Sequence, residues 1–507
     1  MANQAAISSI CPYASAVGRD VMENGGNAVD ATIAAGAVLT VTSQNFCGLG
    51  GDLFALVWEY SSVAPAALNA SGRAGSGANA QALRDAGHTE IPFKGSLDSV
   101  PVPGCVDGWE ALHEKYGTRP WADLIAPAQE LAANGFIAPR SLEQGAALLK
   151  GIDGAEEILA AKAGENLRRP RTAAALHAIA TEGRSGFYQG EFGTGLIEMG
   201  GGLFTASDLA RVQADWEEPL AQVAAGHTIW TSRPNSQGYL LSLAMRILDY
   251  LEEPADEGMW AHHIIEASRL AGYDRLDFLH EDADAESLLS DAEQRASRIS
   301  PDSRANVTLA QRHGGTTYMA VSDAQGMAVS YIQSNASGFG AHLFEPRTGI
   351  SLQNRGTGFN LRPGHEAEYG PGKRPPHTLL PAMVTRQDGS LRLVAGTMGG
   401  DAQPQIVTQL LDRILRRGMS VDEAISAPRV RLDAGPTGFG TWSHTQAVQL
   451  EEASPETWET GLRERSHEVE RVTNKFGHAH LIEIDEAGDV SAAADPRAET
   501  PSADVFL

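Results

Sequence analysis

The sequence predicts an α+β fold on three observations. Helical patterns run from Tyr13 through Glu182, a polar segment begins at Asp291, and strand-like runs start at Thr316. The 507 residues far exceed the roughly 150 residues typical of one domain, so the chain can bury a large core. Hydrophobic residues make up 42% and charged residues 20% of the chain, which is typical of a globular protein.

The first two helices are predicted from their ends. Tyr13 to Glu23 suits a short amphipathic helix that stops at Asn24-Gly25-Gly26, because glycine readily adopts the left-handed conformation that ends helices. Asn27 can cap the next helix, Ala28 to Leu39. That helix is apolar on most faces, which predicts a buried helix packed under a sheet.

A glycine turn, Cys47 to Asp52, leads into the apolar run Leu53 to Trp58, which we interpret as a buried strand. The turn is no phosphate-binding loop, because it lacks a Gly-Lys-Ser/Thr ending and precedes a strand instead of a helix. Further helices are expected from Trp109 to Gly135. One of them starts at Pro120-Trp121, after a stop at Tyr116-Gly117.

The segment Asp291 to Arg312 is polar, charged and weakly periodic, so we expect a surface linker and a boundary there. The two runs that follow, Thr316 to Ser322 and Met327 to Ser334, predict a β-hairpin. The loop between them, Asp323 to Gly326, suits a type I turn with a G1 bulge. If Asp323 faces Met327, the register places Thr316 opposite Ser334, and a slip of one residue would break that pairing.

Charge and cysteine content exclude several classes of partner. The formal net charge is −25 and no Lys/Arg-rich run offsets it, so we expect no nucleic acid and no membrane as partner. The three cysteines, Cys11, Cys47 and Cys105, are irregularly spaced and are interpreted as reduced thiols. Met1 to Cys11 has no basic region, and no run of about 18 apolar residues occurs, which predicts a cytoplasmic protein.

The histidines do not predict a metal site. His478 and His480 share a face if their segment is a strand, but two imidazoles without a third ligand rarely bind zinc. The neighbours His262 and His263 diverge on a helix. We therefore expect no metal and no cofactor.

The stretch His313-Gly314-Gly315-Thr316-Thr317 is the most informative for chemistry. Attack of a threonine hydroxyl on the preceding carbonyl needs a distorted peptide bond, which Gly315 permits because it lacks a Cβ. Once freed, the α-amine of Thr316 would have a pKa near 8 and could accept the hydroxyl proton. Threonine is common in strands, so this stretch alone does not decide between a catalytic and a structural role.

Two further features fit amide chemistry. Gly399-Gly400 follows the apolar strand Leu391 to Ala395 and could present two backbone N–H groups to an oxyanion, although a simple turn explains it equally. Arg73 could bind a substrate carboxylate with its bidentate guanidinium, although most arginines are solvated surface charges.

Over nearly its whole length, the chain resembles the γ-glutamyltransferase family of N-terminal nucleophile hydrolases. The segments that carry the resemblance are, in chain order, Gly25 to Ala31, Gly48 to Gly51, Val102-Pro103-Gly104 with Gly108, Gly186-Phe187-Tyr188, the strand from Thr316 ending in Asp323 and Gly326, Phe339-Gly340, Thr348-Gly349-Ile350, Gly372-Lys373-Arg374-Pro375, Gly399-Gly400 and Asp495-Pro496-Arg497.

The resemblance implies a four-layer αββα sandwich made as a precursor. The precursor would be cut into a large subunit, residues 1–315, and a small subunit, residues 316–507, which stay associated in one αββα unit. A homodimer of such pairs is an assembly that the resemblance allows.

The resemblance also assigns site residues. It makes Gly315–Thr316 the cleaved bond and Thr316 the nucleophile, with Ser334 as a second hydroxyl that supports the amine. Gly399 and Gly400 would form the oxyanion hole, and Arg73 would hold the α-carboxylate of the substrate. The other substrate-binding positions that it implies are Asn335, Arg355, His377 and Thr378.

Four positions, in two places, depart from the pattern of γ-glutamyl-specific members. Where these carry an amide or acid and an aspartate for the α-ammonium, this chain has Arg355 and Gly358, and where they carry paired serines it has His377-Thr378. A cation cannot hold an ammonium group, so Arg73 and Arg355 together favour a small acidic amide, such as an oxo-acid amide or a glutaryl-type side chain.

Three further segments bear on the substrate. Asn235 to Gly238 and Leu352 to Gly356 resemble a divergent branch of the family that includes oxamate amidohydrolase. The segment between Phe359 and Lys373 is shorter than in relatives with a lid loop, which predicts an open pocket.

We therefore expect an amidohydrolase or acyltransferase that forms an acyl-Thr316 ester and passes the acyl group to water or an amine. A glutathione γ-glutamyl transpeptidase or hydrolase is one alternative. The other is an inactive binding protein on the same fold, which the presence of Thr316, Ser334, Gly399 and Gly400 disfavours.

Overall fold

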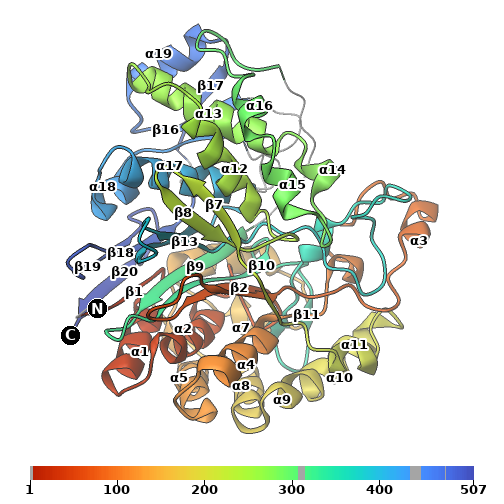
Figure 1. The fold of residues 1–507 in the computed structure, drawn as a ribbon. Coiled ribbons are helices and arrows are strands. Elements are labelled where there is room, and N and C mark those ends of the chain that lie inside the picture. The colour runs from red at the N-terminus through yellow and green to blue at the C-terminus, as the bar shows by residue number, and fades with distance from the viewer. Residues whose placement is uncertain (1–3, 307–314, 434–446, 474–475) are drawn as a thin grey trace.

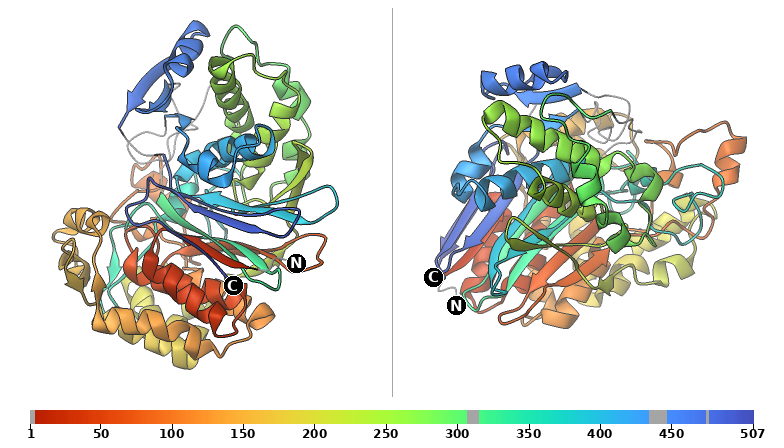
Figure 2. Two further views of the ribbon diagram at one scale, coloured as in Figure 1. Left: turned by 90° about the vertical axis from the view of Figure 1, so that its left-hand side faces the viewer. Right: turned by 45° about the horizontal axis from the view of Figure 1, so that its top comes forward.

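Two β-sheets lie face to face, and helices cover the outer side of each (Figures 1 and 2). The structure is a computed structural model that describes residues 4–306, 315–433, 447–473 and 476–507. The layers follow the order helix, sheet, sheet, helix. The four-layer αββα sandwich implied by the resemblance is therefore confirmed.

The first sheet has seven strands, and the second has six. In spatial order, the first sheet contains β20 (Ser502–Phe506), β1 (Ala5–Ser9), β9 (Gly315–Ser322), β10 (Ala328–Ala336), β2 (Asp52–Trp58), β3 (Ala66–Ala70) and β6 (Asp215–Glu217). The second contains β19 (Val490–Ala494), β18 (Ala479–Ile484), β14 (Leu391–Thr397), β13 (Ala382–Thr385), β8 (His227–Thr231) and β7 (Leu220–Ala224). Neighbouring strands are antiparallel throughout, and β1 pairs with β20, so the first and last strands lie side by side.

Helices form the two outer layers. The main helices beside the first sheet are α1 (Pro12–Glu23), α2 (Ala28–Thr42), α4 (Cys105–Tyr116), α5 (Trp121–Asn134) and α8 (Pro170–Glu182). Those beside the second are α12 (Gly238–Asp249), α13 (Glu257–Gly272) and α17 (Gln403–Leu415). Short segments that matter for the site are α14 (Arg275–Phe278), η3 (Arg355–Gly358) and η4 (Gly400–Ala402).

Strand periodicity explains how the layers are held together. Along β2, Phe54, Leu56 and Trp58 pack between the two sheets, whereas Leu53, Ala55 and Val57 face the helices of the first layer. Successive side chains of a strand point to opposite faces, so one apolar run supplies both cores. All these side chains are buried, which explains why the sequence is apolar at every position of this strand and does not alternate.

The predicted N-terminal helices are confirmed. The α1 helix ends at Glu23 with Asn24 as its C-cap, and Gly25 follows with a φ of 88°. The side chain of Asn27 accepts a hydrogen bond from the N–H of Asp30, and the Asp30 carboxylate accepts one from Asn27 N, which completes a capping box. Every residue of α2 is buried, as the apolar composition predicts.

The hairpin β9–β10 has the predicted register from Ser322 to Thr317, but the predicted backbone pair of Thr316 with Ser334 falls within a bulge. Ser322 pairs with Ala328 and Thr317 with Gln333, after which a bulge shifts the pairing so that Gly315 faces Ala336. In the turn, Asp323 N donates to Met327 O at 2.9 Å, and Gly326 has a φ of 92°. The glycine at the end of the turn therefore fixes which side chains meet at the far end of the hairpin.

One prediction about this region is wrong in part. The segment expected to be a linker contains the helix α16 (Ala292–Ala296), in which Ala292 and Ala296 are buried. Arg295 is buried too, and its Nη2 forms an ion pair with Asp274 at 2.7 Å. Packing of this long side chain outweighs the polar composition. Residues 307–314 lie outside the described residues.

Within the part of the chain that the structure describes, no helix has the length and apolar character needed to span a bilayer.

Candidate active site

The hydroxyl of Thr316 lies where the two sheets meet the start of α17. Thr316 begins the hairpin strand after Gly315, and its Oγ1 donates to Ser334 Oγ at 3.2 Å. Gln403, the first residue of α17, donates from Nε2 to Thr316 Oγ1 at 3.3 Å. All three residues are buried. A hydroxyl from the first sheet is thus positioned by a side chain that follows the second sheet.

Gly399 and Gly400 lie between β14 and α17, and two residues, Asp401 and Ala402, separate them from Gln403. Their φ values of 147° and 59° favour glycine, because residues with a Cβ rarely adopt them. Gln237 Nε2 donates to Gly400 O at 3.0 Å and so fixes the orientation of this turn. Backbone N–H groups in such a turn, at the start of a helix, can stabilise an oxyanion.

Arg355 places a guanidinium beside the same hydroxyls. Its Nη2 donates to Ser334 Oγ at 3.2 Å, and its Nη1 donates to Thr378 Oγ1 at 2.9 Å. Only 2% of Arg355 is exposed. Burial lowers the pKa of Arg355 to about 10, although the nearby Asp52 raises it, so the side chain stays cationic at neutral pH. The structure therefore joins Thr316, Ser334, Arg355 and Thr378 in one chain of hydrogen bonds.

His377 lies in the wall of the site and is held by Asp52. His377 Nε2 is 3.0 Å from Asp52 Oδ2, and its Nδ1 accepts from Leu379 N at 3.2 Å, so Nε2 carries the proton of the neutral ring. Burial, together with the charge of Arg355, lowers the pKa of His377 to about 3. Both ring nitrogens are thus used within the protein, and the neutral ring positions Asp52 opposite Ser334 in the sheet.

The segment Asn235 to Gln237 holds the strand-like segment that carries His377 and Thr378. Asn235 Nδ2 donates to Pro375 O at 2.7 Å, Ser236 Oγ donates to Leu379 O at 2.6 Å, and Gln237 Nε2 donates to Thr378 O at 2.9 Å. Three successive side chains therefore fix the backbone from which Thr378 reaches Arg355.

Arg73 occupies a different environment. Its Nη2 forms an ion pair with Asp215 Oδ2 at 3.0 Å, and Arg374 Nη2 contacts the same oxygen at 2.9 Å. The Arg73 side chain is 12% exposed, and its Nη1 is buried without a hydrogen-bond partner. Arg73 follows Gly72, whose N–H donates to Asp52 Oδ1 at 2.9 Å. The backbone next to Arg73 and the ring of His377 therefore share the Asp52 carboxylate.

Asn335 is turned toward the glycine turn. Its Nδ2 donates to Gln44 O at 3.0 Å, and its N–H donates to Phe46 O at 3.2 Å. A Cβ at Gly51 would lie 2.3 Å from Ser334 O, so the glycine turn is needed for close packing against this end of β10. Asn335 is therefore held by the segment that leads into the glycine turn. Its contact with substrate stays a prediction.

Sequence reasoning missed Gln403, Asp52 and Gln237. Asp52 and Gln237 stand within motifs that the sequence did single out, but their side-chain partners come from distant segments. Gln403 is the first residue of the helix after Gly399-Gly400, and its polar side chain at a buried position is the one signal that could have found it.

The histidines have partners within the fold. His480 Nδ1 lies 2.9 Å from Ser8 Oγ, and burial lowers the pKa of His480 to about 3. His262 Nδ1 lies 2.9 Å from His467 Nε2. Among the described residues, no group of three or more His, Cys, Asp or Glu side chains is arranged to hold a metal ion.

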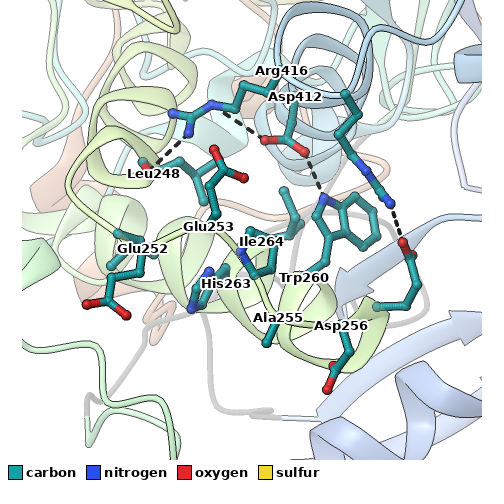
Figure 3. A pocket seen from close by; sticks show the side chains of 14 residues that line it. Leu248, Glu252, Glu253, Ala255, Asp256, Trp260, His263, Ile264, Asp412 and Arg416 are labelled. Carbon is teal, nitrogen blue, oxygen red and sulfur yellow. Dashed lines mark hydrogen bonds and ion pairs between the residues drawn. The ribbon is translucent and has the colours of Figure 1, made fainter.

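A hollow at the far end of α17 is separate from this site (Figure 3). Its lining includes Trp260, whose Nε1 donates to Asp412 Oδ2 at 2.7 Å, together with Glu253 and Arg416. Asp412 lies nine residues beyond Gln403, which corresponds to about 14 Å along the helix. This hollow therefore does not include the Thr316 hydroxyl.

The sequence model of the family described as gamma-glutamyltranspeptidase matches residues 14–505. The chain belongs to this family. Two relatives are each 33% identical to the chain. They are the glutathione hydrolase-like YwrD proenzyme of Bacillus subtilis (strain 168), over 96% of this chain and 95% of the relative, and the oxamate amidohydrolase proenzyme of Klebsiella pneumoniae, over 95% of both.

A solved structure agrees with this assignment. The crystal structure of cephalosporin acylase from Bacillus halodurans has a TM-score of 0.90 and 30% identity, and the match covers 99% of this chain and 96% of that one. As a γ-glutamyltranspeptidase-family protein with acylases and amidohydrolases among its relatives, the chain is an amide hydrolase or acylase of the N-terminal nucleophile type. The resemblance stated from the sequence is confirmed.

Proposed function

We propose that the chain is a self-cleaving amidohydrolase or acyltransferase that acts on a small acidic amide through an acyl-Thr316 ester. The observation that carries this proposal is the Thr316 hydroxyl, at the start of β9, between Ser334 Oγ and Gln403 Nε2. A threonine with its own α-amine as base is an established nucleophile.

Self-cleavage comes first in this proposal. Thr316 Oγ1 attacks the carbonyl carbon of Gly315, the C–N bond breaks, and an ester replaces the amide while the Thr316 amine is freed. Water then hydrolyses the ester, which gives fragments 1–315 and 316–507. Gly315 lacks a Cβ and so permits the distorted geometry of the first step.

Turnover uses the same atoms. The freed amine accepts the Thr316 proton as the oxygen attacks the substrate amide, and Gly399 and Gly400 stabilise the oxyanion. The leaving amine departs, and water or a second amine takes the acyl group from Thr316. Ser334, which accepts from Thr316 and from Arg355, orients the nucleophile.

The substrate class follows from the charges around Thr316. Arg355 supplies a buried positive charge whose Nη2 reaches Ser334, and Arg73 follows Gly72, whose N–H donates to Asp52. At Gly358, a Cβ would lie 2.3 Å from Pro376 O. The backbone of Pro376 therefore fills the space that an aspartate side chain at this position would need to bind an ammonium group. These features favour an anionic acyl group without a neighbouring ammonium. One relative is named for oxamate, which is an anionic amide of this kind.

The first test is the mass of the purified protein. The wild type should yield two fragments, the smaller beginning at Thr316, whereas Thr316→Ala should stay one chain and lose all turnover. Thr317→Ala is the matched control, because its neighbouring hydroxyl donates to Gln333 O at 3.1 Å instead. It should still be cleaved. An uncut wild-type protein with full activity would rule out the mechanism.

The second test compares acyl groups. Rates on glutaryl-anilide, γ-glutamyl-anilide and oxamate are measured on one preparation, and the anionic acyl groups without an ammonium should be favoured. A clear preference for γ-glutamyl would support the glutathione hydrolase alternative, which the name of the Bacillus subtilis relative suggests. Cleavage without turnover of any of them would support an inactive binding protein.

A further inference from the structure

A cavity of about 260 Å³ lies beside the helical turn that carries Arg355. Gly358 and Asn360 line one side of it, next to Pro376, and Arg275 and Leu279 line the other. Gly358 is the last residue of η3, whose first residue, Arg355, reaches Ser334. The cavity is therefore lined by the last residue of the helical turn that begins with Arg355.

Arg275 is a buried cation with few partners. Its side chain is 4% exposed, and its nearest carboxylate oxygen is Asp401 Oδ1, 3.9 Å from Nη2. Within the described residues its guanidinium donates no hydrogen bond, and Nε is buried without an acceptor. Buried polar groups are almost always hydrogen-bonded, and an arginine has five donors, so this side chain retains capacity for an anion.

The position of Arg275 relates it to the reaction. Asp401, its ion-pair partner, follows Gly400 directly in the chain, so Arg275 lies behind the turn that would hold the oxyanion. Besides burial, the charge of Arg275 lowers the pKa of Arg355 and of His377, so Arg275 lies near two residues of the site.

We infer that Arg275 is a specificity-determining residue that binds the terminal carboxylate of the acyl chain in this cavity. This inference rests on the proposed function and sharpens it. The favoured substrate is then a monoamide of a dicarboxylic acid with several carbons between its two ends, such as a glutaryl amide. Water converts it to the free dicarboxylate and the released amine. A two-carbon acyl group such as that of oxamate is too short to reach Arg275.

The test compares a charged substrate with its neutral analogue. Values of kcat/KM are measured for glutaryl-anilide and butyryl-anilide with the wild type, Arg275→Met and Arg275→Lys. The preference for glutaryl should fall by about 30-fold in Arg275→Met and by about 5-fold in Arg275→Lys, while the butyryl rate changes little. Arg362→Met is the matched control, because Arg362 lines the same cavity but is half exposed and paired with Asp277. It should keep the preference.

Binding gives a readout that does not depend on turnover. Glutarate is titrated calorimetrically into the wild type, Arg275→Met and Arg362→Met, with thermal melting as the check on folding. Binding should weaken by about 30-fold in Arg275→Met alone. An unchanged preference or unchanged glutarate binding in folded Arg275→Met would overturn the inference. If the wild type hydrolyses nothing, the proposed function fails, while glutarate binding still decides on Arg275.

Discussion

The two arginines that the resemblance assigns to substrate binding have opposite surroundings. Arg355 is buried and donates to the hydroxyls of Ser334 and Thr378, whereas Arg73 lies at the edge and shares the carboxylate of Asp215 with Arg374. The two hydroxyls that Arg355 contacts are neutral, although the carboxylates of Asp52 and Asp401 also act on its charge. Arg73 instead contacts the Asp215 carboxylate directly, which neutralises much of its charge. Arg355 should therefore act on an anionic substrate far more strongly than Arg73.

The largest expected effect comes from removing the buried charge. Arg355→Met should lower kcat/KM for an anionic substrate by a factor of about 100 to 1000, because a charge pair made in a water-poor site is lost. Arg73→Met should lower it by only about tenfold. Steady-state kinetics on cleaved protein checks both values. Equal losses in the two variants would break the comparison between these arginines.

A smaller effect should appear in the pH dependence of stability. His377 is held neutral in the Arg355 region, with a pKa lowered to about 3 by burial and by Arg355, against about 6.5 for an unfolded histidine. Because the folded-state pKa is depressed, its contribution to stability is complete above pH 6.5 and is lost as the pH falls toward 3. The slope is at most about 1.4 kcal/mol per pH unit.

Denaturant unfolding between pH 7 and pH 4 measures this slope. His377→Gln should flatten the fall in the free energy of unfolding relative to the wild type. The exposed residue His88 provides the control, and His88→Gln should leave the slope as it is. An unaltered slope in His377→Gln would show that this ring does not control the acid stability of the region.

The smallest effect concerns the compensated arginine. Burial raises the pKa of Asp215, but Arg374 and Arg73 lower it by more, so the carboxylate stays charged. Asp215→Asn should release Arg73 and raise kcat/KM for an anionic substrate by less than about fivefold. Since the Asp215 side chain is half exposed, the free energy of unfolding should change by less than about 1 kcal/mol. A decrease in kcat/KM would instead indicate that Asp215 orients Arg73.

Local rules explain what the sequence could predict. The turn Asp323 to Gly326 and the two-residue period of the strands set the register that brings Thr316 to Ser334. The cap at Asn27 likewise depends on residues next to it. Each of these features is decided by neighbours in the chain, so its residue types carry the information.

Partners from distant segments could not be predicted in this way. Gln403 is 87 positions from Thr316, and Asp52 is 325 positions from His377, so no local pattern joins them. The same holds for Arg275, which lies on a four-residue helix and faces Asp401. The α16 helix was missed because its composition is polar, although Ala292 and Ala296 pack into the core and the buried Arg295 is paired with Asp274.

The strand order of the seven-stranded sheet has a consequence for a chain cut after Gly315. From one edge to the other, β20 would come from the C-terminal piece, β1 from the N-terminal one, β9 and β10 from the C-terminal one, and β2, β3 and β6 from the N-terminal one. The two polypeptides would thus be interlaced through three ladders of backbone hydrogen bonds. A molecule nicked in this way would not come apart on dilution, and neither half produced alone would find the strands it needs to fold.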